Sequence, residues 1–131
     1  MHRMRPFLLM VLVPLLAFAD EKPQTQGDVN EQARKSLQVA DKALNETWKQ
    51  VLAANAENPK LVERLKAAQK TWLTFRDAQV EALWGDDRFS ARPMCQAAVL
   101  EQLTRERTAW LKELMHVEEG DVCASTSAPV K

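Results

Sequence analysis

The sequence predicts an all-α fold, an antiparallel bundle of three long helices. Apolar residues recur every three or four positions along three stretches of the chain, which is the period of an α-helix. Short polar segments connect the stretches, and no run of alternating apolar and polar residues indicates a β-strand. Helices that each carry one apolar stripe bury those stripes by packing side by side, so we expect a bundle.

The first predicted helix begins at Val29 and ends near Asn55. Before it, residues 20–28 contain no apolar residue, and we expect a flexible lead because such a segment has nothing to bury. The apolar stripe of this helix consists of Leu37, Ala40, Leu44, Trp48 and Val51.

The second predicted helix has clear signals at both ends. Asn58 followed by Pro59 makes a favourable cap and first turn, and Gly85 is a typical residue for ending a helix. The stripe between them consists of Leu61, Leu65, Ala68, Trp72, Phe75, Gln79 and Leu83.

The third predicted helix is capped by Ser90 and tolerates Pro93 in its first turn. The helical domain then spans residues 29–118, and residues 119–131 are predicted to form a tail that is disordered from Ala124 to Lys131. We interpret the tryptophans at 48, 72 and 110 as packing residues. The buried side of the third helix is predicted to hold Val99, Leu103, Trp110, Leu114 and Val117.

Residues 1–19 have the layout of a secretory signal peptide. Basic residues precede an apolar run from Phe7 to Leu16, and Ala17-Phe18-Ala19 follows, which predicts cleavage before Asp20. The run is shorter than the roughly 20 residues of a membrane span. We therefore predict an exported chain, periplasmic or secreted, rather than one held by an uncleaved anchor. A lipoprotein would need a cysteine at the cleavage point.

The rest of the chain is the size of one domain. The 131 residues less the first 19 leave 112, with 18 acidic residues and, without Arg3 and Arg5, 16 basic ones. The resulting net charge of about −2 argues against nucleic acid as a partner. The sequence does not indicate an oligomeric state.

Cys95 and Cys123 are the two cysteines, and in an exported protein they predict one disulfide. A straight helix over residues 95–115 rises about 30 Å, whereas residues 116–123 reach at most about 28 Å. A bridge within one chain therefore requires a late helix start, a bend or an early helix end. We favour that bridge; the alternatives are a bond between two chains and a free thiol.

The sequence offers no recognisable catalytic or metal-binding motif. His116 is the only histidine after residue 19, which excludes a histidine-based triad or a multi-histidine metal site within one chain. There is also no glycine-rich phosphate loop or nucleophile elbow. A hydrolase with paired carboxylates is the remaining enzymatic alternative, but acidic residues on helices are more typical of a solvated face. We expect a binding protein without catalytic activity, cofactor or metal.

Several polar residues lie beside the apolar stripes and predict a shared network. Such groups need partners, and Asp41 with Arg76 or Arg107 is the charged pair that a bundle could make. We interpret the network as fixing helix register; a ligand site lined by the same residues is the alternative. The predicted members are Asp41, Asn45, Gln69, Arg76, Asp77, Thr104 and Arg107.

Three short motifs occur in order along the chain: Asp41-x-x-Leu44-Asn45-x-x-Trp48, Gln69-x-x-Trp72-x-x-x-Arg76-Asp77 and Leu103-Thr104-x-x-Arg107-x-x-x-Leu111. Over residues 37–114 the chain resembles the N-terminal domain family of the LprI-type lysozyme inhibitors. The resemblance implies an exported helical domain with a protein partner, and for some members inhibition of lysozyme. Val80 and Val99 stand where family members often carry cysteines, so the family's disulfide layout does not transfer.

If the chain inhibits lysozyme, the loop from Gly85 to Ser90 is the expected contact. Arg88 and Ser90 would donate hydrogen bonds to the catalytic carboxylates in the cleft. Asp86 and Asp87 would meet a basic rim and speed the encounter.

Two other functions remain open from the sequence. One is a periplasmic structural or assembly partner that uses Trp84 and Phe89 as anchors. The other is an immunity protein against a toxin that degrades the cell wall. Both are binding functions.

Overall fold

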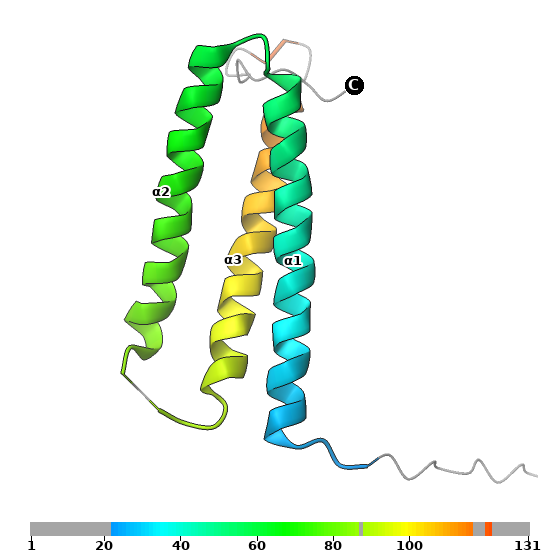
Figure 1. The fold of residues 1–131 in the computed structure, drawn as a ribbon, viewed down its shortest axis with the longest axis vertical. Coiled ribbons are helices and arrows are strands. Elements are labelled where there is room, and N and C mark those ends of the chain that lie inside the picture. Colours follow the sequence, from blue (N-terminus) through cyan, green and yellow to red (C-terminus); the bar gives the residue numbers. More distant parts are fainter. Residues whose placement is uncertain (1–21, 87, 117–119, 122–131) are drawn as a thin grey trace, which may run out of the picture.

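Three helices form the structure, a computed structural model that describes residues 22–86, 88–116 and 120–121. They are α1 (Gln26–Ala54), α2 (Pro59–Trp84) and α3 (Arg92–Leu114), and no strand occurs among the described residues. α2 runs antiparallel to α1, and α3 returns in the direction of α1 (Figure 1). The predicted all-α fold of three long helices is confirmed.

The three helices pack unequally. α1 and α3 lie side by side and share an extensive contact, whereas α2 makes a much smaller contact with α3 (Figure 1). The backbones of α1 and α2 come close at hardly any point. α2 is therefore the least enclosed of the three.

The apolar core lies mainly between α1 and α3. Leu44 and Val51 of α1 meet Leu111 at the end of α3 and Met115 just after it. Val51 and Leu111 are fully buried, and the half-buried Trp72 of α2 packs against this cluster. The stripe predicted for α1 faces the core: its members are buried or half-buried.

The helix ends follow local capping chemistry. Asn58 Oδ1 accepts a hydrogen bond from the Leu61 N–H at 3.1 Å, and Gly85, with φ of 33°, ends α2. The sequence predicted both residues as the ends of this helix. The predicted start of α1 is too late, because the helix begins at Gln26 and not at Val29. The flexible lead predicted over residues 20–28 is therefore too long. Thr25 and Asp28 form a capping box, which starts the helix earlier.

The predicted cap of α3 was wrong. Ala91 occupies the cap position without a side-chain hydrogen bond, and Ser90 instead accepts through its backbone carbonyl from Asn30 Nδ2 at 3.0 Å. Asn30 of α1 thereby holds the chain just before α3 in place. Pro93 lies in the first turn, as predicted.

The predicted buried side of α3 was also wrong in part. Trp110 is 50% exposed, and Val99, Leu103 and Leu114 are only half-buried. A close parallel contact between α1 and α3 favours short side chains, which explains why larger ones lie beside it. The residues of α3 that are buried are Ala97, Thr104, Thr108 and Leu111.

The stripe of α2 is exposed at several positions because α1 does not cover it. Phe75 is 52% exposed and Leu83 is 50% exposed, and Ala68 is exposed as well. Leu61, by contrast, is buried near the turn where α2 begins close to α1.

The predicted signal peptide (1–19) and Val117 lie outside the described residues, as does most of the predicted tail. No helix in the described part of the chain is long and apolar enough to cross a membrane.

We predict that Thr25→Ala lowers the free energy of unfolding by about 1 kcal/mol, the usual loss for removing a cap. Thr74→Ala is the matched control, because Thr74 is exposed within α2 and, among the described residues, its hydroxyl donates only to the Lys70 carbonyl. Alanine favours a helix interior, so this control should be neutral or slightly stabilising. Urea unfolding followed by circular dichroism measures both; equal losses would contradict the assigned cap.

The capping box also predicts a pH dependence. Hydrogen bonds from the Thr25 backbone N–H and hydroxyl hold the pKa of Asp28 below its ordinary value of 3.8. The folded state therefore favours the carboxylate, and its stabilisation is present above about pH 4 and lost as the pH falls through the folded pKa. Asp28→Asn should lose less stability than the wild type between neutral pH and pH 2 in the same urea assay. Parallel losses would contradict this.

Candidate functional site

Arg76 connects all three helices. From α2, its Nη1 donates to Asp41 Oδ1 on α1 and to Thr104 Oγ1 on α3, both at 3.2 Å. Its Nε donates to Asp77 Oδ1 at 3.2 Å. The Arg76 side chain is 17% exposed and Thr104 is fully buried, so these bonds lie largely away from water. The sequence left Arg76 and Arg107 as alternative partners of Asp41, and the structure pairs Asp41 with Arg76.

Arg107 forms a second link, between α3 and α2. Its Nε donates to the buried Gln69 Oε1 at 2.9 Å. The guanidinium carbon lies 4.6 Å from the centre of the Trp110 ring and 5.7 Å from that of Trp72. Arg76 approaches the Trp72 ring as well, at 5.5 Å. Trp72 therefore contacts both arginines and joins the two links.

Six of the seven predicted network residues take part in these contacts, while Asn45 is exposed on α1 and stands outside them. Every buried side-chain nitrogen or oxygen among the described residues has a hydrogen-bond partner. That completeness favours the interpretation that the network sets helix register.

Sequence reasoning missed the stacking of arginine on tryptophan. The spacing of four residues from Trp72 to Arg76, and of three from Arg107 to Trp110, could have indicated it.

In the described part of the loop between α2 and α3, three backbone carbonyls are anchored and several side chains are exposed. Arg92 donates through its side chain to the Gly85 carbonyl and through its N–H to the Phe89 carbonyl, at 3.1 Å for the latter. Asn30 holds the Ser90 carbonyl. Arg88 and Ser90 are exposed, and Phe89 is 44% exposed.

The other residues predicted to contact a partner near this loop differ in how far they are exposed. Asp86 is exposed, Trp84 is half-buried, and Asp87 lies outside the described residues. Trp84 therefore offers less surface to a partner than Phe89 does.

Cys95 has no disulfide partner among the described residues and is half-buried in the first turns of α3. Cys123 lies outside the described residues, so the disulfide between them remains a prediction. Within the described residues, no group of three or more His, Cys, Asp or Glu side chains is placed to hold a metal ion.

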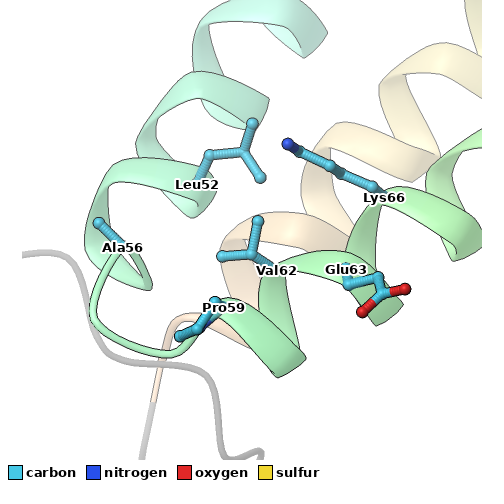
Figure 2. Close-up of a pocket in the computed structure, with 6 residues that line it drawn as sticks. All are labelled: Leu52, Ala56, Pro59, Val62, Glu63 and Lys66. Carbon is cyan, nitrogen blue, oxygen red and sulfur yellow. The ribbon is translucent and has the colours of Figure 1, made fainter.

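A hollow of about 490 Å³ lies where α1 ends and α2 begins (Figure 2). Leu52 and Val62 face each other across it, while the Lys66 amine extends over its mouth and the Glu63 carboxylate points away. This hollow is lined mostly by apolar groups and carries no pair of reactive side chains.

A second hollow, of about 290 Å³, lies between α2 and α3 beside Arg107. It is lined by Trp72, Phe75, Leu103, Glu106, Arg107 and Trp110. We call these six residues the aromatic groove.

Comparison with known proteins gives two matches. A family model described as Lysozyme inhibitor LprI matches residues 19–111, which include α1, α2 and most of α3. A protein of Rhizobium meliloti (strain 1021), described as uncharacterized protein R02472, is 37% identical over an alignment of 111 residues that covers 76% of this chain and 80% of that protein. No solved structure matches the chain.

We predict that Arg107→Ala lowers the free energy of unfolding by about 1 to 3 kcal/mol. The substitution leaves the buried Gln69 oxygen without its donor and removes the stacking on two tryptophans. Arg105→Ala is the control, because Arg105 is exposed and its one ion pair within the described part of the chain is with Glu101, one turn away. It should change stability by less than about 0.5 kcal/mol. Urea unfolding measures both, and equal effects would contradict the role of Arg107.

Proposed function

The chain belongs to the LprI lysozyme inhibitor family, and on that premise we propose that it inhibits lysozyme by inserting the α2–α3 loop into the enzyme's cleft. Inhibition of this kind is a binding function and requires no catalytic group of its own. The proposal also requires an exported chain, because lysozyme acts on the cell wall; the signal peptide predicted in residues 1–19 would provide export.

The observation that carries the proposal is that three backbone carbonyls in the described part of the loop are anchored. The carbonyls of Gly85, Phe89 and Ser90 are each held by a hydrogen bond from Arg92 or Asn30. A segment that is already ordered loses less conformational entropy when it binds. The loop therefore presents its exposed side chains in a form that suits insertion into a preformed cleft.

The exposed side chains fit the chemistry of a glycosidase cleft. Such enzymes use a pair of carboxyl groups on either side of the bond that they break. Arg88 supplies a guanidinium and Ser90 a hydroxyl, and both groups donate hydrogen bonds to carboxylates. Asp86, exposed beside them, would favour approach to a basic rim of the cleft.

We predict that Arg88→Ala weakens inhibition at least about tenfold, because a charge-assisted hydrogen bond of about 1.5 kcal/mol or more would be lost. The measurement is the clearing of a cell-wall suspension by animal-type lysozyme at increasing concentrations of the protein. Arg88 is exposed, so the variant should fold as the wild type does.

The matched control is Arg64→Ala. Arg64 is also an exposed arginine, but it lies near the start of α2, about 30 Å along the helix from the loop. It should inhibit as strongly as the wild type. If Arg88→Ala inhibits lysozyme as strongly as the wild type does, the interface lies elsewhere than the loop. A wild-type protein that slows no lysozyme would reject the function and favour an assembly partner or an immunity protein.

A further inference from the structure

Arg107 is a partly buried cation with no acidic partner among the residues that the structure describes. Among the described residues its only hydrogen bond is to the amide oxygen of Gln69, whereas Arg76 is paired with Asp41 and Asp77. Burial lowers the pKa of Arg107, which reflects the loss of water around its charge. A guanidinium in this state gains more from a carboxylate than one that is fully hydrated.

Large apolar side chains surround Arg107 and remain half open to solvent. Trp110 is 50% exposed and Phe75 is 52% exposed on opposite helices of the aromatic groove. Tryptophan and arginine are over-represented among the residues that dominate the energy of protein interfaces. Exposed aromatic groups that line a hollow, rather than lying scattered singly, are typical of a contact surface.

We propose that the aromatic groove is a docking surface for a protein partner that presents a carboxylate next to an apolar side chain. The Nε of Arg107 is taken by Gln69, and the terminal Nη groups keep N–H donors for one carboxylate. Phe75 and Trp110 offer the apolar contact on either side. Charge complementarity therefore selects the partner, and the aromatic rings contribute most of the buried area.

The one acidic residue of the groove limits what the partner can carry. Glu106 is exposed and accepts a hydrogen bond from the Gln102 amide, so its charge lies at the rim. A second carboxylate on the partner would be repelled there. The groove is thus suited to a single acidic residue between apolar neighbours rather than to an acidic run.

This surface is separate from the loop proposed to bind lysozyme. Arg107 lies 15 residues beyond Arg92, about 22 Å along α3 from the loop. The inference therefore goes beyond lysozyme inhibition and does not depend on it.

The test is a titration of the full chain, labelled with nitrogen-15, with the peptide acetyl-Leu-Glu-Leu-amide. The indole N–H of Trp110 and the Nε–H of Arg107 should shift in nuclear magnetic resonance spectra and saturate. The matched peptide acetyl-Leu-Gln-Leu-amide should bind at least about tenfold more weakly, because it lacks the charge. Equal binding of the two peptides, or no shift at these two groups, would overturn the proposal.

Substitutions separate docking from folding. Trp110→Ala and Phe75→Ala should each weaken binding of the Glu peptide at least about threefold and leave the Gln69 bond intact. Arg107→Lys keeps the positive charge but loses the planar set of guanidinium N–H donors, so it should weaken peptide binding as well. Leu83→Ala, also half exposed on α2 but outside the groove, should bind normally.

The loop variant distinguishes this proposal from the previous one. Arg88→Ala should bind the Glu peptide as the wild type does, whatever its effect on lysozyme. Loss of peptide binding in Arg88→Ala, or normal binding in both Trp110→Ala and Phe75→Ala, would overturn docking at the groove.

Discussion

The guanidinium of Arg76 is the contact on which the arrangement of the three helices depends. α1 and α3 can hold each other through their apolar core, but α2 shares little backbone contact with α1. Arg76 spans that separation and reaches Asp41 on one side and Thr104 on the other. Hydrogen bonds are directional, so this contact specifies how α2 is placed in a way that apolar packing alone would not.

The open packing of α2 has a direct consequence for the surface. An apolar stripe that is not covered by another helix stays in contact with water, as Phe75 and Leu83 do. Arginine is well suited to such a boundary, because its plane stacks on tryptophan while its nitrogen atoms donate to polar partners. Arg107 does both, with Trp110 on one side and Gln69 on the other. The same residues that attach α2 to α3 therefore leave a groove suited to binding.

The two proposed binding surfaces use different physical means. Three carbonyls of the α2–α3 loop are held by Asn30 and Arg92, and the loop presents Arg88 as an exposed donor. The aromatic groove instead offers a guanidinium that has already lost part of its water, flanked by rings. Membership of the lysozyme inhibitor family favours lysozyme as a partner and assigns it to neither surface. A helical bundle with two such surfaces could hold two partners at once.

The sequence by itself determined the number of helices and most of their ends, since apolar periodicity and caps such as Asn58 and Gly85 are local properties. It also indicated the members of the polar network apart from wrongly including Asn45, because polar residues beside an apolar stripe need partners. Only the tertiary structure decided that Asp41 pairs with Arg76, that Ser90 is held by Asn30, and that Trp110 faces solvent. These outcomes depend on how closely each pair of helices approaches. Periodicity shows which face of a helix is apolar, but not how much of that face another helix will cover.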